Sequence, residues 1–276
     1  MFFHIDESGN SGNNLFDSNQ PVLSYGVLSA KTNVDVLATQ EHARILRTLG
    51  SDTLHANKMG IAGILAILEG LARLHLKFKF RFDYYFIHKP SYAIAMLFDA
   101  IFDAGLNEAV KWDRYWTPLR FPLVAAIGML ADEALLREGW ELRLIPRGKL
   151  AAAQPRIVNL LSTLLQRLET NSHIDKRLRE ILRDGLLFGI TNPLELDFGT
   201  EIPKSLSPNA VGFQFVLACM AKRSKAAQRK VLRITVDRQS EFNPAQIQTH
   251  LHRSQISSVL QKKPGRPGVV CRASLT

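Results

Sequence analysis

The chain has 276 residues and a mass of 31.0 kDa, with 46% hydrophobic and 22% charged residues, so it is long and apolar enough to bury a core. Its formal net charge of +10 and its pI near 9.8 favour a polyanionic partner such as a nucleic acid. Charge alone leaves a basic but merely soluble protein equally open.

No apolar run was found that approaches the roughly 20 residues of a membrane span, so we expect no membrane association. The N-terminus has no basic segment ahead of an apolar one, and we therefore expect no signal peptide. Cys219 and Cys271 share no C-x-x-C spacing and do not form a zinc site by themselves. A reduced, cytoplasmic setting is the expectation.

The chain begins MFFHIDESGNSG, in which Phe3 and Ile5 alternate with His4 and Asp6. This alternation predicts a short strand that carries His4 and Asp6 on one face. Residues 9–14 have turn composition, and residues 22–29 read as a second strand. Residues 2–29 therefore predict a β-hairpin with a long loop.

Two helices are expected next. Residues 34–49 have a helical pattern, and the segment MGIAGILAILEGLARL then predicts a helix with one apolar stripe. That stripe consists of Ile61, Ile64, Leu65, Leu68 and Leu71.

The segment LKFKFRFDYYF at 76–86 predicts a strand with one aromatic face and one mostly basic face. The first face holds Leu76, Phe78, Phe80, Phe82, Tyr84 and Phe86, and the second holds Lys77, Lys79, Arg81, Asp83 and Tyr85. We expect helices to cover the aromatic face and solvent to meet the basic one. A nucleic-acid platform on the basic face is the alternative.

Residues 91–185 are predicted to be mostly helical. The three tryptophans at 112, 116 and 140 are expected to fill core or interface space rather than to stack on bases. Ser207 and Pro208 predict the start of a further helix. In KVLRITVD, the residues Leu232, Ile234 and Val236 alternate as in a strand that ends at Asp237. Asn243 and Pro244 predict one more helix, and residues 261–276 read as an irregular basic tail.

Two predicted strands thus end in an acid, Asp6 and Asp237. If the strands are neighbours in one sheet, the two carboxylates converge and repel each other unless a proton or a cation compensates them. Mg²⁺ and Mn²⁺ prefer carboxylate oxygens and can support phosphodiester hydrolysis. The alternative is that each acid is only a turn residue or a cap.

Three segments in order, HIDESGNSG, TLHANKM at 53–59 and ITVDRQSEFNPAQ, resemble the motifs of the domain of unknown function 3800 family. The resemblance implies a ribonuclease H-like fold, an α/β mixed sheet flanked by helices, as a single domain over 1–260 with a helical insertion at about 91–185. It also implies a divalent-metal-dependent nuclease or nucleic-acid-processing protein. Asp6, Glu7 and Asp237 match the expected Mg²⁺ or Mn²⁺ ligands, and Lys58 closes the second motif as a site residue.

The sequence departs from that family pattern in two places. Thr53 stands where the second motif usually has an acid, with Asp52 one place earlier. After Asp237 the only acid is Glu241, whereas family members usually carry a further acidic ligand on a C-terminal helix. We therefore expect impaired catalysis and a truncated or frame-shifted C-terminus. The alternative function is a non-catalytic nucleic-acid or protein-binding module with the same fold.

Overall fold

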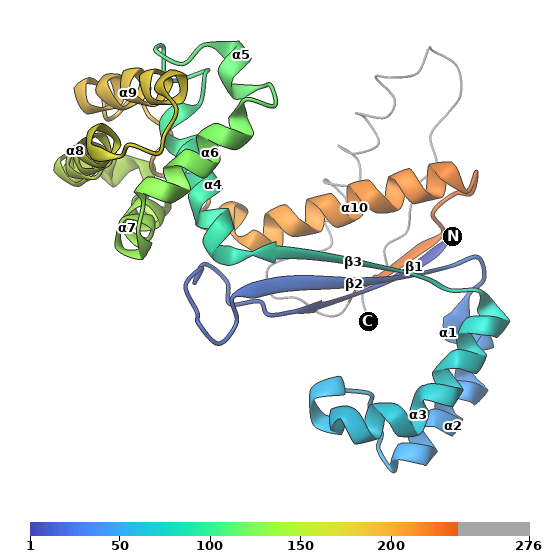
Figure 1. The fold of residues 1–276 in the computed structure, drawn as a ribbon. Helices are drawn as coiled ribbons and strands as arrows, with labels where there is room; N and C mark the ends of the chain where they lie inside the picture. Colours follow the sequence, from blue (N-terminus) through green and yellow to red (C-terminus); the bar gives the residue numbers. More distant parts are fainter. Residues whose placement is uncertain (237–276) are drawn as a thin grey trace. The chain divides into compact units, whose positions relative to one another are not determined.

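The computed structural model describes residues 1–236, except for the side chain of Asn57. These residues form an α/β protein whose four strands lie in one mixed sheet of order β3-β2-β1-β4 (Figure 1). The strands are β1 (Phe2–Ser8), β2 (Val22–Ala30), β3 (Arg81–His88) and β4 (Arg233–Val236). β1 pairs antiparallel with β2 and parallel with β4, which confirms the hairpin expected over 2–29.

The described chain divides into two compact units. The sheet unit contains Met1–Ser8, Ser24–Phe86 and the described residues from Gly212 onward, and the helical unit contains Gly9–Leu23 and Ile87–Val211. Besides the strands, the sheet unit holds α1 (Val34–Leu37), α2 (Thr39–Leu49), α3 (Ala56–Phe78) and most of α10 (Pro208–Ala226). The helix predicted at 34–49 is thus interrupted at Ala38.

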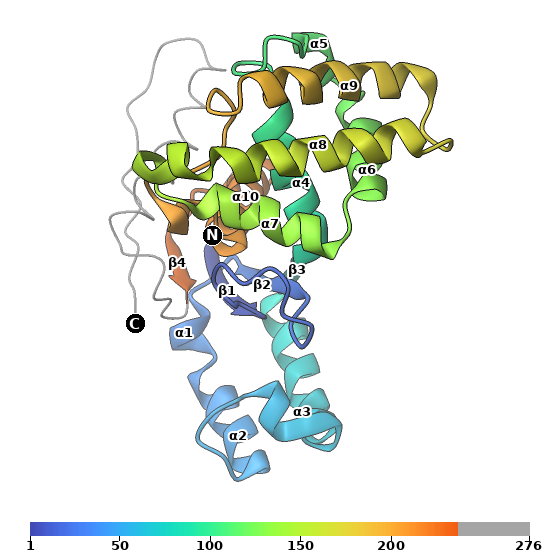
Figure 2. The ribbon, with the colours of Figure 1, turned by 90° about the vertical axis from the view of Figure 1, so that its left-hand side faces the viewer.

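The helical unit corresponds to the helix-rich segment expected at about 91–185 and extends it (Figure 2). Its α-helices are α4 (Lys89–Phe102), α5 (Trp112–Tyr115), α6 (Arg120–Leu130), α7 (Glu133–Leu144), α8 (Gln154–Thr170) and α9 (Lys176–Thr191). Of two 3₁₀-helices, η1 (Arg147–Ala153) lies between α7 and α8 and η2 (Pro203–Leu206) follows α9. Leucine and isoleucine side chains at helical spacing on α4, α8 and α9 form its core.

One face of the sheet packs against α10. Phe3 and Ile5 of β1 and Tyr25 of β2 are buried, and the Tyr25 ring lies 6.4 Å from that of Phe213 on α10. The Ser207 hydroxyl accepts a hydrogen bond from the backbone N–H of Ala210 at 3.1 Å, as the predicted cap requires. The expected alternation of Ile234 and Val236 is confirmed as well, since both are buried.

The prediction of a strand over 76–86 is wrong in where the strand begins and in which of its faces is exposed. Residues up to Phe78 belong to α3, which ends at Lys79 in the left-handed conformation (φ 52°). From Arg81 onward the alternation holds, but Phe82, Tyr84 and Phe86 are exposed by 66%, 58% and 64%. The expected solvent face meets α10 instead, because Asp83 forms an ion pair with Arg223.

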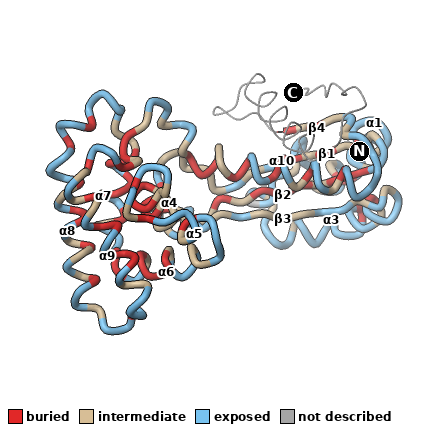
Figure 3. The backbone as a smooth tube through the Cα atoms, turned by 90° about the horizontal axis from the view of Figure 1, so that it is seen from above, coloured by how far each residue is buried: buried red, intermediate tan, exposed pale blue. Residues whose placement is uncertain are grey.

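The apolar stripe predicted on α3 is also exposed (Figure 3). α3 packs on α2 through Ile67 and Leu74, which contact Ile45, so the stripe from Ile61 to Leu71 faces away. By length and composition Lys58–Phe78 is apolar enough to cross a membrane, contrary to our reading of the sequence. One such helix is weak evidence of a membrane span.

The tryptophans follow the expectation only in part. Trp140 is buried, and its indole N–H donates to the carbonyl oxygen of Asn13 at 2.7 Å. Trp112 and Trp116 are instead 69% and 58% exposed and contact each other with ring centroids 5.3 Å apart. Neither residue therefore packs in the core, to which this segment contributes Tyr115 instead, and packing at an interface stays a prediction for both.

Candidate functional site

Asp6 lies near the end of β1 on the face of the sheet opposite α10. Side chains alternate along a strand, so the burial of Phe3 and Ile5 against α10 directs His4 and Asp6 to the other face. Asp6 is exposed, and its partner in the register with β2 is Gly26. The prediction that His4 and Asp6 share one face is confirmed.

β4 runs parallel to β1 at its other edge. The register pairs Phe3 with Ile234 and Ile5 with Val236, and Val236 is the last described residue. The next residues in the sequence are Asp6 and Asp237, of which Asp237 lies outside the described residues. The predicted adjacency of the two strands is thus present, and they run in the same direction.

Glu7 does not share the face of Asp6. Alternation along β1 places it on the same face as Phe3 and Ile5. Its register partner on β2 is Tyr25, which is 1% exposed. The two neighbouring carboxylates therefore point to opposite faces of the sheet. Side-chain alternation separates the pair that the sequence places next to each other.

Lys58 lies in the first turn of α3 and is exposed. The uninterrupted part of α3 follows the kink at Gly60, and from Ile61 to Phe78 it is about 27 Å long at 1.5 Å per residue. Its N-terminal end lies away from the sheet in both ribbon views (Figures 1 and 2). The structure therefore does not bring Lys58 to Asp6, and exposed Asp52 precedes the same end of the helix.

Sequence reasoning missed a charged cluster on the same face as Asp6. The Asp35 carboxylate lies 3.6 Å from Nδ1 of His4 and 3.1 Å from Nη1 of Arg233. These residues come from β1, α1 and β4, so nothing in their sequence spacing predicts the contact. Burial lowers the pKa of His4 and outweighs the opposing effect of the Asp35 carboxylate, while Arg233 lowers it further.

This lowered pKa predicts that the free energy of unfolding falls as the solution is acidified. Below the ordinary histidine pKa of 6.5 the unfolded chain binds the proton more readily than folded His4 does, so acid favours unfolding. The stability that depends on neutral His4 is fully present above pH 6.5, and it is lost as the pH falls toward the pKa of His4 in the folded protein. Urea unfolding between pH 5 and pH 8 measures this slope.

His4→Gln is expected to flatten that slope. His75→Gln, which replaces an exposed histidine on α3, is the matched control and is expected to retain it. An identical slope in wild type and His4→Gln would show that other groups cause the acid sensitivity.

Within residues 1–236, no three His, Cys, Asp or Glu side chains come together as ligands for a cation. At the β1–β4 edge the described strands contribute the carboxylate of Asp6, with Glu7 on the other face. These residues alone do not fit the Mg²⁺ or Mn²⁺ site that the family resemblance implies. The other predicted ligand, Asp237, lies outside the described residues.

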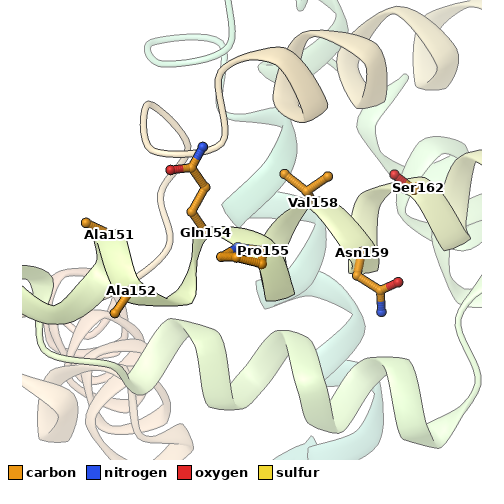
Figure 4. A pocket seen from close by; sticks show the side chains of 7 residues that line it. All are labelled: Ala151, Ala152, Gln154, Pro155, Val158, Asn159 and Ser162. Atoms are coloured by element: carbon orange, nitrogen blue, oxygen red, sulfur yellow. The ribbon is translucent and has the colours of Figure 1, made fainter.

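Two other features of the helical unit offer no catalytic group. Buried Lys89 donates from Nζ to Ser11 Oγ and to the carbonyl oxygen of Gln20, both at 2.6 Å, which anchors the loop after β1 to α4. A hollow beside η1 and α8 has no ionisable side chain in its lining (Figure 4). It is lined by Ala151, Ala152, Gln154, Pro155, Val158, Asn159 and Ser162.

Comparison of the whole chain with protein-family models, with curated proteins and with solved structures finds no match.

Proposed function

We propose that this protein is a divalent-metal-dependent nuclease or nucleic-acid-processing protein with a ribonuclease H-like fold. The observation that carries the proposal is the parallel pairing of β1 with β4, in which Ile5 lies opposite Val236. The sequence continues from these partners to Asp6 and Asp237. Adjacent strands are about 4.8 Å apart, so pairing continued by one residue would bring the two acids to one edge.

The sheet supports the ribonuclease H-like part of the proposal. It is mixed, it packs against α10 on one face, and β1 carries Asp6 two residues before its end. A mixed sheet with acids near the ends of its strands is what the motif resemblance implies. The net charge of +10 suits a polyanionic substrate.

Mg²⁺ or Mn²⁺, when bound, would supply a Lewis acid for phosphodiester hydrolysis. Among residues 1–236, Asp6 is the one predicted ligand at this edge, and no complete ligand set is present there. Asp6 would hold the cation together with Asp237. Glu7 and Lys58 remain proposals of the sequence, and the geometry described above favours neither at this edge.

The test compares wild type with Asp6→Asn, a substitution that preserves side-chain size and removes one charge. Calorimetric titration with Mg²⁺ or Mn²⁺, and digestion of labelled single- and double-stranded DNA and RNA, are the measurements. We expect weak metal binding and low turnover in wild type, because the usual C-terminal acid is missing, and loss of both in Asp6→Asn. Folding stability is expected to change little, since Asp6 is exposed.

Asp52→Asn is the matched control, because Asp52 is also an exposed aspartate of the sheet unit but lies ahead of α3. It is expected to leave metal binding unchanged. Undiminished turnover in Asp6→Asn would remove Asp6 from the mechanism.

A second candidate is a non-catalytic nucleic-acid or protein-binding module. The exposed aromatic side chains of β3 favour it, because binding surfaces often use such residues. Binding of nucleic acid by wild type without any cleavage under all metal conditions would establish this alternative.

A further inference from the structure

β3 presents three aromatic side chains on the face of the sheet opposite α10. Phe82, Tyr84 and Phe86 alternate with Asp83 and Tyr85, and each is more than half exposed. In an extended strand, alternate residues are about 6.6 Å apart. The three rings therefore form a row along the edge strand, which we call the aromatic row.

Neighbouring residues of β2 hold two of these rings in place. A Cβ atom at Gly26 would lie 3.2 Å from the Phe82 ring, so this ring lies against the bare backbone of β2. The Tyr84 hydroxyl is hydrogen-bonded to Ser24 Oγ at 2.7 Å, and the Tyr84 and Phe86 rings are stacked with centroids 6.0 Å apart. These contacts limit ring motion, which reduces the entropy lost when a ligand binds.

The aromatic row lies beside Asp6 across the sheet. Gly26, against which the Phe82 ring lies, is the register partner of Asp6 on β1. Directly opposed residues of an antiparallel pair point to the same face. Phe82, Gly26 and Asp6 thus form one line across three adjacent strands.

The charge of the protein is concentrated in the unit that carries this face. The described residues of the sheet unit contain fourteen Lys and Arg against seven Asp and Glu, a net charge of +7. The helical unit contains fifteen against sixteen, a net charge of −1. Two exposed lysines, Lys77 and Lys79, lie just before β3 in the sequence. A polyanion is therefore attracted to the sheet unit rather than to the helical unit.

We propose that the aromatic row binds single-stranded nucleic acid by stacking with its bases, while the basic residues before β3 attract its phosphates. Unpaired bases stack on exposed aromatic rings with little dependence on sequence, whereas the bases of a duplex are already stacked on one another. This inference rests on the proposed function for the class of ligand. It adds the strand preference and a binding surface that leads to Asp6.

The experiment measures fluorescence anisotropy of labelled oligodeoxythymidine, oligouridine and a duplex with the full chain in EDTA at low salt. Wild type is expected to bind both single strands more tightly than the duplex. Phe86→Ala is expected to weaken single-strand binding by about 5- to 150-fold, the range for loss of one stacked base. Phe86→Leu keeps an apolar side chain but removes the ring, and is expected to weaken binding as well.

Phe121→Ala is the matched control, because Phe121 is 75% exposed but belongs to the helical unit, and it is expected to bind as wild type does. Unchanged affinity in both Phe86 variants would overturn the proposal. So would affinity retained in Phe86→Leu and lost in Phe86→Ala, because an apolar contact would then suffice and ring stacking would not be needed. EDTA removes the divalent cation, so this assay does not depend on nuclease activity. Single-strand binding by wild type and its loss in both Phe86 variants would support the aromatic row even if the protein were not a nuclease.

Discussion

Replacing Gly9 with alanine is expected to destabilise the protein by about 2–5 kcal/mol, the combined cost of a positive φ and of overpacking. Gly9 has φ +84°, and a Cβ atom there would lie 2.1 Å from the carbonyl oxygen of Val22. Because that oxygen belongs to the backbone, no side-chain rotation relieves the clash. Urea unfolding followed by circular dichroism measures the change.

Gly50→Ala is the matched control for this prediction. Gly50 also has a positive φ, +59°, but nothing lies within 4 Å of a Cβ atom built there. Its replacement is expected to cost only about 1–2 kcal/mol, the conformational part. Equal losses in the two variants would show that close approach of the backbone is not the reason for glycine at position 9.

Replacing Asp197 with alanine is expected to destabilise the protein by about 2–4 kcal/mol. Its carboxylate lies 2.5 Å from Nη1 of Arg143, a residue that is only 5% exposed. Removing one partner of a buried ion pair costs roughly 3–5 kcal/mol, because the other charge loses its counter-charge. Since the Asp197 side chain is 32% exposed, solvent screening reduces that value. Arg143 also donates to the backbone carbonyl oxygen of Asp197, an acceptor that the variant keeps.

Arg147→Ala is the control, because Arg147 contacts the same carboxylate at 3.3 Å but is 57% exposed. Its loss is expected to cost less than about 1 kcal/mol in thermal or urea unfolding. If the two variants were equally stable, the Arg143–Asp197 pair would not be an important contact of the helical unit.

The same residues explain the Asp-Phe-Gly sequence at 197–199, which in kinases binds Mg²⁺. Here Phe198 is fully buried, and Gly199 has φ +74° with the carbonyl oxygen of Ile145 3.1 Å from where its Cβ would be. With Asp197 paired to arginines, each residue of the tripeptide has a packing role. No Mg²⁺-binding function is needed to account for this tripeptide.

Much of the sheet could be predicted because its local patterns were clear. Alternation in HIDES and in RITV predicts strands with Ile5 and Ile234 buried, and turn-forming residues after Ser8 predict the hairpin. Ser207 and Pro208 likewise predict the start of α10. These features depend on neighbours in the sequence, so the sequence alone determines them.

Periodicity indicates which residues share a face but not what covers that face. The rings of Phe82, Tyr84 and Phe86 lie on one side of β3 as predicted, yet α10 packs on the other side, where Arg223 pairs with Asp83. The apolar stripe of α3 faces outward for a related reason, since α2 packs on Ile67 and Leu74. In both cases the packing of another helix decides which face is buried.

The candidate site divides in the same way. The sequence by itself determines that acids follow two alternating segments, at Asp6 and Asp237. The tertiary structure decides that β1 and β4 pair in parallel, that Glu7 points away from Asp6, and that Lys58 lies at the distant end of α3. It also brings Asp35 to His4 and Arg233, and Phe82 into line with Asp6. These relations depend on strand register and on packing between segments that are 231 residues apart in the pairing of Phe3 with Ile234 (234 − 3), which local sequence patterns do not specify.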